Sequence, residues 1–438
     1  MNNMKMNKNL FCSCLICFLF CSCKITGQIT QQQINNFLND TAIATGHVGV
    51  SVYEPATGRY LYNYNADKNF MPSSNVKLFS LYAGMKYLGD SIVGIRYLQT
   101  DSTISIIPTG DPTLLHPDFN TQPVVDFLKS TNAAVQINKY NFKPTAYGNG
   151  WAWNDYPDYY MAERSSFPVY GNCITFITKK NTVQTIPKNL SIFKVDISNQ
   201  EKNLSTAVKR DFFTNNFNVL LDNSTNETVI TPFITSVTLA AKLLSDSLKK
   251  SIEIISNDTS TINLKKIYSR PVDSLFKPMM YESDNFFAEQ TLLMASNAKL
   301  GYMSDEAIID TLLATDLKDI PTKPRWVDGS GLSRYNLFSP KDFIFILDKL
   351  QNEFGLERMK RILPTGGQGT LSSYYLMDKG FIYAKTGSMS NNVSLSGYLI
   401  TKKNKLLLFS VMINNYDGGG RAGRRAIEKF IHSIRENN

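Results

Sequence analysis

The chain has 438 residues, 43% hydrophobic and 19% charged, a globular composition that excludes a disordered, collagenous or coiled-coil protein. Its formal net charge is +9, but it contains no dense basic run of the kind that indicates nucleic-acid binding. Three histidines are present, and five of the six cysteines lie within the first 23 residues. A disulfide framework and a multi-cysteine zinc site are therefore excluded from the rest of the chain, and no metal is expected.

Residues 1–27 have the pattern of a secretory signal peptide. A short basic start precedes an apolar run over 10–20, which is too short for an ordinary membrane span. Small residues follow and permit two cleavage positions. Cleavage before Cys23 removes 1–22 and leaves a cysteine that can carry a lipid anchor, whereas cleavage after Gly27 leaves a soluble protein. Both predict an exported, periplasmic protein, and the choice between them stays open.

The elements predicted near the two chain ends combine strands with a flanking helix. In chain order they are a helix over 31–44, strands over 48–53, 59–65, 381–385, 393–401 and 405–414, and a helix over 421–434. Because both ends have this character, we expect them to share one antiparallel sheet of about five strands covered by helices, in an α+β domain.

The middle of the chain has a different composition and residue pattern. Between 101 and 229, short β-like runs alternate with Asn, Thr, Pro and Gly, which indicates an inserted β-rich domain. We therefore predict a main domain made of 28–100 and 230–438, with 101–229 inserted into it. The further helices predicted in the main domain cover 237–250, 285–298, 305–315 and 340–354.

A neutral lysine can activate a serine nucleophile, and a Ser-x-x-Lys motif on a helix places both side chains within one turn. The motif occurs five times, at Ser74, Ser191, Ser247, Ser274 and Ser296. Only Ser74 follows a proline-containing lead-in and opens a strong apolar helix. A serine there is often only a cap. The same position also stabilises a developing oxyanion and lowers the pKa of the following Lys77.

Ser283-Asp284-Asn285 directly precedes a predicted helix. Its structural interpretation is an N-cap cluster, since all three residue types favour that position. Its functional interpretation is a relay hydroxyl at Ser283 and an amide at Asn285 that binds both Lys77 and a substrate amide.

Lys385-Thr386-Gly387 ends a predicted strand and occurs once. Its structural interpretation is an edge-strand lysine followed by a turn glycine. In the functional interpretation, Lys385 attracts a substrate carboxylate and lowers the pKa of Lys77, while Thr386 bonds that carboxylate. Gly387 leaves the strand bare, so that a substrate backbone can pair along it.

The three motifs in this order form the signature of penicillin-binding proteins and class A β-lactamases. The chain resembles the class C low-molecular-mass penicillin-binding proteins, the D-alanyl-D-alanine carboxypeptidase/endopeptidases, over nearly all of its length after the signal peptide. The 209 positions from Ser74 to Ser283 are similar to the long insertion that marks this class. The stretches that carry the resemblance are PSSNVK at 72–77, GDPTL at 110–114, WAWND at 151–155, SDNFFAE at 283–289, DGSGLSR at 328–334 and LP with GTL within 363–371.

The resemblance implies a role for each matching residue. Ser74 would be the acylated nucleophile, Lys77 its base and Ser283 the proton relay to the leaving group. The oxyanion hole would consist of the N–H groups of Ser74 and Ser388. The remaining implied site residues are Asn285 and Lys385 for positioning, Thr386, Gly387 and Ser388 along the substrate strand, and Asp155 and Arg334 for reading the peptide stem.

The implied activity is serine-type cleavage of the D-Ala-D-Ala bond in peptidoglycan stem peptides, with β-lactams as inhibitors and no cofactor. Three alternatives stay open from the sequence. The first is a β-lactamase or esterase that uses the same Ser-Lys pair. The second is a catalytically silent cell-wall-binding protein that uses the β-rich insertion. The third is a His-dependent serine hydrolase that uses His47, His116 or His432.

Overall fold

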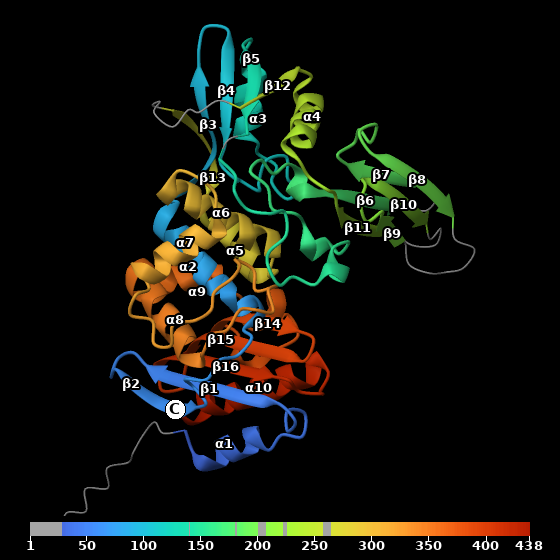
Figure 1. Cartoon of the computed structure of the whole chain (residues 1–438). Helices are drawn as coiled ribbons and strands as arrows, with labels where there is room; N and C mark the ends of the chain where they lie inside the picture. Colours follow the sequence, from blue (N-terminus) through green and yellow to red (C-terminus); the bar gives the residue numbers. More distant parts are fainter. Residues whose placement is uncertain (1–28, 140, 180–181, 200–206, 222–225, 257–263) are drawn as a thin grey trace, which may run out of the picture.

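The computed structural model describes residues 29–139, 141–179, 182–199, 207–221, 226–256 and 264–438 (Figure 1). The predicted signal peptide and Cys23 lie outside the described residues. Within the described ranges, no helix is both long enough and apolar enough to cross a bilayer.

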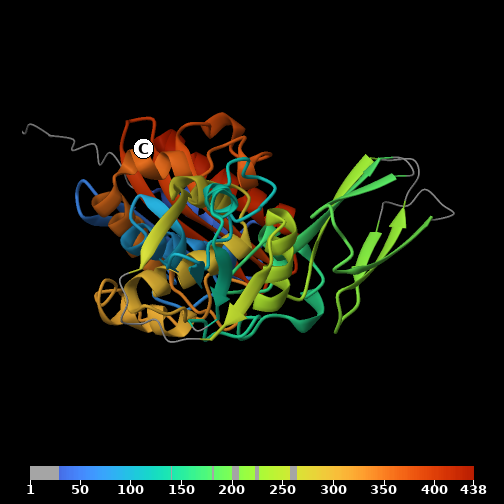
Figure 2. The same cartoon turned by 90° about the horizontal axis from the view of Figure 1, so that it is seen from above.

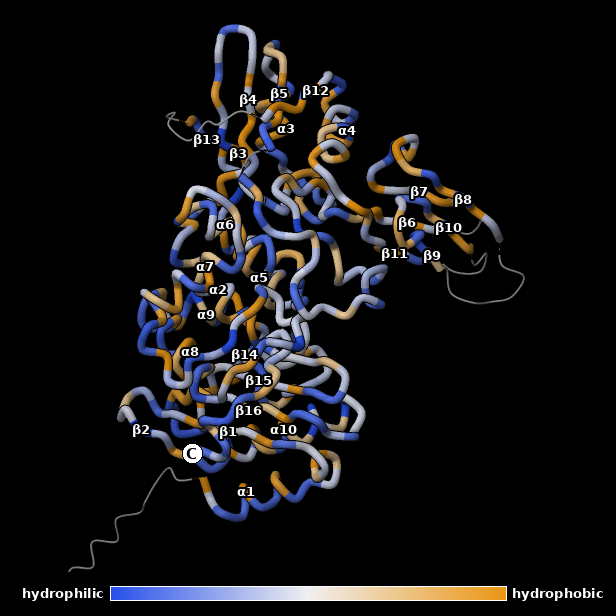
Figure 3. Tube along the Cα trace, viewed as in Figure 1, coloured by the Kyte–Doolittle hydropathy of each residue, from blue (hydrophilic) through white to orange (hydrophobic). Residues whose placement is uncertain are grey.

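Both ends of the chain contribute strands to one five-stranded sheet, as the sequence predicts. Val50 of one chain end lies opposite Val411 of the other, and every pair of neighbouring strands is antiparallel. Figure 3 shows that the central strand β16 (Leu406–Asn414) is largely hydrophobic, whereas the outer strand β2 (Arg59–Tyr64) is more hydrophilic. The strands, in spatial order, are β14 (Ile382–Met389), β15 (Asn392–Ile400), β16 (Leu406–Asn414), β1 (His47–Glu54) and β2 (Arg59–Tyr64).

Helices cover both faces of this sheet (Figure 1). On one face, α1 (Gln31–Leu38) packs on the C-terminal helix α10 (Gly420–Asn437), where the rings of Phe37 and Phe430 stack at 4.5 Å. Phe430 also belongs to the core formed by the strand residues Val50 and Val411. The α+β fold predicted from the sequence is therefore confirmed.

The opposite face carries a helical layer whose core includes Phe79, Phe338 and Met412. Ser339 caps the helix that lies directly on the sheet, because its hydroxyl accepts a hydrogen bond from the N–H of Asp342 at 3.2 Å. The helices of this layer are α2 (Lys77–Tyr87), α5 (Asp273–Tyr281), α6 (Asn285–Leu300), α7 (Asp305–Ala314), α8 (Pro340–Phe354) and α9 (Leu356–Ile362).

A second five-stranded sheet lies at the far end of the helical layer (Figure 1). Its apolar face packs against two helices, α3 (Pro123–Ser130) and α4 (Val237–Leu248). Its strands, in spatial order, are β12 (Ile252–Ile255), β5 (Ala134–Asn138), β4 (Thr103–Pro108), β3 (Ser91–Gln99) and β13 (Lys265–Pro271).

Two three-stranded sheets, drawn in green, project from one side of the body (Figure 2). Their inner residues Phe176 and Phe217 join the core of the second five-stranded sheet. The first contains β11 (Asn226–Pro232), β6 (Cys173–Lys179) and β7 (Thr182–Ile186), and the other contains β8 (Lys194–Asn199), β10 (Asn216–Leu221) and β9 (Ala207–Arg210).

These sheets bear on the predicted limits of the insertion, 101–229. Strand β3 precedes that range and strands β12 and β13 follow it, yet all three pair within the second five-stranded sheet. Because a paired strand belongs with the core that its sheet builds, we propose 91 and 271 as the limits of the inserted unit.

Candidate active site

Ser74 lies in the single 3₁₀ turn Ser73–Val76, which leads directly into α2. The Nδ2 group of Asn75 donates to the hydroxyl of Ser396 at 2.9 Å, which fixes the turn to the main sheet. Ser73 has a φ of 50°, a left-handed conformation that costs energy for a residue with a side chain. The backbone is therefore strained immediately before the candidate nucleophile.

The side chain of Lys77 is completely buried and reaches back to Ser74. Its Nζ atom donates to Ser74 Oγ at 2.9 Å, to Asn285 Oδ1 at 2.6 Å and to the Ser330 carbonyl at 2.7 Å. Burial lowers the pKa of Lys77 to about 8, and the nearby carboxylates, Asp284 foremost, oppose that shift. A substantial fraction of this amine is thus neutral near pH 8, which is the form that a base requires.

Ser283 and Lys385 form the second pair. Ser283 lies between α5 and α6 with a φ of 62°, and its hydroxyl accepts a hydrogen bond from Lys385 Nζ at 2.8 Å. Lys385 is also completely buried. Burial, and next the charge of Lys77, lower the pKa of Lys385 well below its usual range. The Lys77 and Lys385 amines are therefore close enough for their charges to repel each other.

Asn285 connects the two halves of the site at the start of α6. Its Oδ1 accepts from Lys77, and its Nδ2 donates to the carbonyl of Tyr160 at 3.1 Å. Asp284 caps the helix, because its Oδ1 accepts from the Phe287 N–H at 2.7 Å. The N-cap interpretation of this motif therefore holds for Asp284, and Asn285 remains available to Lys77.

The loop over 328–334, in which the sequence assigns a role to Arg334 alone, supports Lys77 from the other side. Asp328 accepts hydrogen bonds from Gly331 N at 2.9 Å and from Ser333 N at 2.6 Å, which closes the turn. Glu289 Oε1 accepts from the Ser330 N–H at 2.7 Å, and the Ser330 carbonyl accepts from Lys77 Nζ. The Asp-Gly-Ser-Gly run has obvious turn chemistry, but its packing against Ser74 has no signal in a single sequence.

Gly387 packs against the segment that precedes the nucleophile. A Cβ atom at Gly387 would lie 2.6 Å from the Pro72 carbonyl and 2.2 Å from Ser394 Oγ. The sequence suggested that this glycine leaves the strand open to a substrate. In the structure, the absence of a side chain at Gly387 allows the backbone at Pro72 to pack closely against the strand.

Thr386 and Ser388 occupy alternate positions on β14, so their side chains share one side of the strand, opposite that of Lys385. Thr386 lines a small hollow beside α10, and Ser388 accepts a hydrogen bond from Arg424 Nη2 at 2.8 Å. The sequence reasoning did not include Arg424, because nothing local connects it to the strand.

The two residues expected to read the peptide stem lie apart. Asp155 is adjacent to Tyr160, whose hydroxyl pKa is raised by burial first and then by Asp158 and Asp155. The backbone carbonyl of Tyr160 accepts a hydrogen bond from Asn285 Nδ2. Arg334 has an exposed side chain, and its backbone N–H donates to the Gly150 carbonyl at 3.2 Å. The Asp155 side chain thus lies near a tyrosine whose backbone contacts Asn285, whereas the Arg334 side chain lies at the surface.

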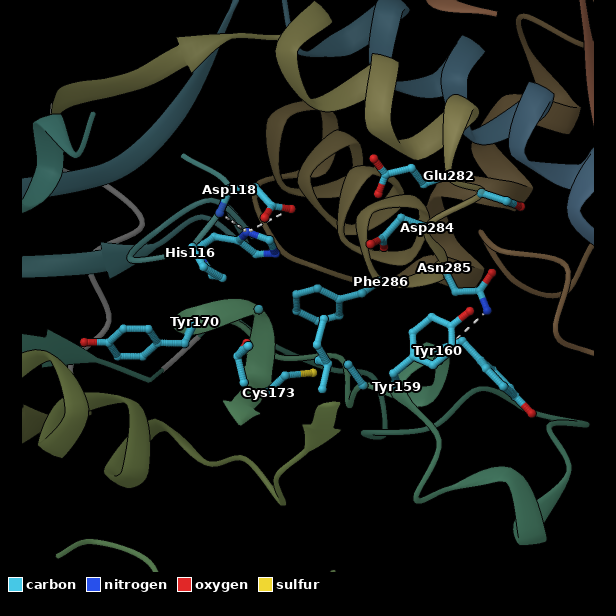
Figure 4. A pocket seen from close by; sticks show the side chains of 16 residues that line it. His116, Asp118, Tyr159, Tyr160, Tyr170, Cys173, Glu282, Asp284, Asn285 and Phe286 are labelled. Atoms are coloured by element: carbon cyan, nitrogen blue, oxygen red, sulfur yellow. Dashed lines mark hydrogen bonds and ion pairs between the residues drawn. The ribbon is translucent and has the colours of Figure 1, made fainter. Parts of the chain in front are cut away.

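A pocket lies beside the loop that carries Ser283 (Figure 4). In this view the Asn285 side chain points to the Tyr160 backbone, and the ring of His116 lies across the pocket from Asp284. Burial lowers the pKa of His116 to about 4, so its ring is neutral at pH 7. The pocket is lined by both inserted and main-domain residues, among them His116, Asp118, Tyr159, Tyr160, Cys173 and Glu282.

The histidine alternative has no geometric support among the described residues. His47 lies 3.3 Å from Asn415 Nδ2, and His432 lies 2.9 Å from Asp378. His116 accepts from the Asp118 N–H at 3.3 Å. None of these partners is a serine hydroxyl, whereas Ser74 has a lysine within hydrogen-bonding distance.

A serine hydroxyl bonded to a buried lysine, between a Ser-x-Asn loop and a Lys-Thr-Gly strand, defines a serine hydrolase that works by acyl transfer. Residues 30–434 match the D-Ala-D-Ala carboxypeptidase 3 (S13) family, and the chain belongs to that family. It is therefore a serine peptidase and a penicillin-binding protein.

Individual relatives agree in both sequence and fold. The chain is 22% identical over 440 residues to a D-alanyl-D-alanine carboxypeptidase of Actinomadura sp. (strain R39), covering 89% of this chain and 81% of the relative. The crystal structure of penicillin-binding protein 4 from Haemophilus influenzae superposes with a TM-score of 0.72 at 19% identity, covering 92% of this chain and 98% of that one. A second structure of the same protein, in complex with a β-lactam, gives a TM-score of 0.66 at 17% identity and covers 90% and 96% of the two chains.

Proposed function

We propose that this chain cleaves the D-Ala-D-Ala bond of peptidoglycan stem peptides, as a carboxypeptidase and endopeptidase, with Ser74 as nucleophile and Lys77 as its base. The observation that carries the proposal is the 2.9 Å contact between Lys77 Nζ and Ser74 Oγ at a buried position. Because burial lowers the pKa of Lys77 to about 8, its neutral form, which can accept the hydroxyl proton, is far more populated near pH 7 than that of an exposed lysine.

The proposed reaction has two steps. Neutral Lys77 takes the Ser74 proton while Oγ attacks the carbonyl carbon between the two D-alanines. The N–H groups of Ser74 and Ser388 stabilise the oxyanion. As the C–N bond breaks, the proton taken up by Lys77 passes through Ser283 to the leaving amine, and Ser74 keeps the acyl group. Water then attacks the ester and gives its proton to Lys77. As the ester C–O bond breaks, Lys77 returns that proton to Ser74 Oγ and the shortened peptide leaves.

The other residues hold the substrate. Thr386 and Ser388 bond the terminal carboxylate, and Gly387 lies between them on the strand. Asn285 orients both the substrate amide and Lys77, while Lys385 donates a hydrogen bond to the Ser283 hydroxyl. Asp155 and Arg334 bind the peptide stem beyond the acyl position.

The same chemistry determines partners and location. We propose that the protein works on the cell wall outside the cytoplasm, where its substrate lies. Residues 1–27 would direct its export, or 1–22 if Cys23 carries a lipid anchor.

The deciding experiment is labelling with a fluorescent penicillin. We expect the wild-type chain to give a stable fluorescent band and Ser74→Ala to give none, because the covalent ester is lost. Ser191→Ala, in an exposed Ser-x-x-Lys motif, serves as the matched control and should label normally. Absence of labelling of the wild type would favour a silent binding protein, and rapid release of the label would favour a β-lactamase. Incubation with purified muropeptides then identifies the peptide product by mass.

The pH dependence of acylation follows from the lowered pKa of Lys77. The reactive form is the neutral amine, and its fraction increases as pH rises through about 8. We expect the rate constant for acylation by penicillin to rise about tenfold per pH unit below that value and to level off above it. Stopped-flow measurements from acidic to alkaline pH test this. A rate that falls between neutral pH and pH 8 would contradict lysine as the base.

A further inference from the structure

Arg424 lies in the first part of α10, beside the strand that carries the Lys-Thr-Gly motif. Its Nη2 group donates to Ser388 Oγ at 2.8 Å, and Ser388 itself is exposed to solvent. The Nε atom of Arg424 is buried and has no hydrogen-bond partner among the described residues. The guanidinium is therefore held at the edge of the site by its hydrogen bond to Ser388.

Among the described ion pairs, no carboxylate pairs with Arg424. Its neighbour Arg425, in contrast, pairs with Glu428. Helix α10 has no acidic residue in its first turn, and the unpaired N–H groups at its start add positive potential. The end of β14 therefore lies beside the start of α10 and beside an arginine that has no carboxylate partner among the described ion pairs.

The strand geometry places this charge next to two hydroxyl groups. Thr386 and Ser388 share one side of β14, and Arg424 lines the same small hollow as Thr386. Because Ser388 Oγ accepts the arginine N–H, the hydroxyl proton of Ser388 is free to be donated to a ligand. Two hydroxyl donors and a guanidinium on one side suit a carboxylate, which binds arginine more strongly than it binds neutral donors.

We propose that Arg424 is a substrate-binding residue that, with Thr386 and Ser388, binds the free terminal carboxylate of the substrate. The proposal rests on the proposed function and deepens it. Arg424 makes the enzyme specific for acyl donors that end in a carboxylate, which both a D-Ala-D-Ala terminus and a penicillin possess.

The test compares benzylpenicillin with its methyl ester, which lacks the carboxylate and keeps the reactive ring. The rate constant for acylation of Ser74 is measured by mass spectrometry. For Arg424→Met we expect this constant to fall about 10- to 100-fold with benzylpenicillin, as expected for a lost hydrogen bond to a charged group. With the methyl ester it should stay near the wild-type value.

Two further variants exclude a structural explanation. Arg424→Gln removes the charge but keeps an N–H donor for Ser388, and it should show the same selective loss. Arg425→Met removes the neighbouring arginine, which is already paired, and should leave both rate constants unchanged. Equal losses for the two ligands, or no loss in either Arg424 variant, would overturn the proposal. Failure of the underlying function would look different, because the wild type would then acylate with neither ligand.

Discussion

Replacing Lys77 by methionine is expected to slow acylation of Ser74 by penicillin about 10²- to 10⁴-fold, the range that a positioned general base contributes. Methionine keeps most of the side-chain volume in this fully buried position but cannot accept the Ser74 proton. The second-order acylation rate constant, followed by intact-protein mass spectrometry, measures the effect directly.

The stability of the same variant separates a catalytic role from a structural one. A buried amine costs free energy on folding, so Lys77→Met should unfold at the same denaturant concentration as the wild type or a higher one. Lys86→Met is the matched control on the same helix, because Lys86 is partly exposed and pairs with Glu353 at 2.9 Å. Lys86→Met should acylate at the wild-type rate. If Lys77→Met did so as well, another residue would have to be the base.

Gly331→Ala is expected to lower acylation at least about 100-fold, because a displacement of about 1 Å near the reacting groups can cost that much. Gly331 has a φ of 86°, and a Cβ atom there would lie 2.0 Å from the Ser73 carbonyl. The added methyl group must push the nucleophile turn away from the loop that binds Lys77. The measurement is again the rate constant for acylation, together with denaturant unfolding.

Gly355→Ala separates the clash from the cost of the backbone conformation. Gly355 has nearly the same φ, 85°, but an added Cβ atom would meet nothing within 4 Å. It should lower the unfolding free energy by about 1 kcal/mol and leave acylation unchanged. If the two variants had equal acylation rates, the contact between Gly331 and Ser73 would not position the nucleophile.

The sequence predicts the part of the site that depends on local spacing. Ser74 and Lys77 lie one turn apart, and their contact follows once the segment is helical. The pattern of strands and helices at the two chain ends likewise predicts a shared antiparallel sheet. Here the hydrophobic pattern and the turn residues specify the same structure, so local reasoning is sufficient.

The remaining contacts depend on tertiary packing. Ser283 and Lys385 meet across 102 positions, and no periodicity encodes that distance. Arg424 reaches Ser388 only because α10 covers that face of the sheet. In the insertion, β3 pairs with both β4 and β13, and a single sequence gives no register for the second pairing. Composition alone therefore does not specify the limits of the inserted unit, for which we propose 91 and 271.

The interior position of β1, between β16 and β2, has a consequence for biosynthesis. A ribosome completes β1, β2 and the nucleophile turn long before it reaches the three strands that finish the sheet. Until then the nascent chain has neither Lys385 nor the surface on which the turn packs, and contacts this distant in sequence form late. The hydrolase therefore stays inactive until its last segment has been made, whereas the inserted unit can fold beforehand around its own core.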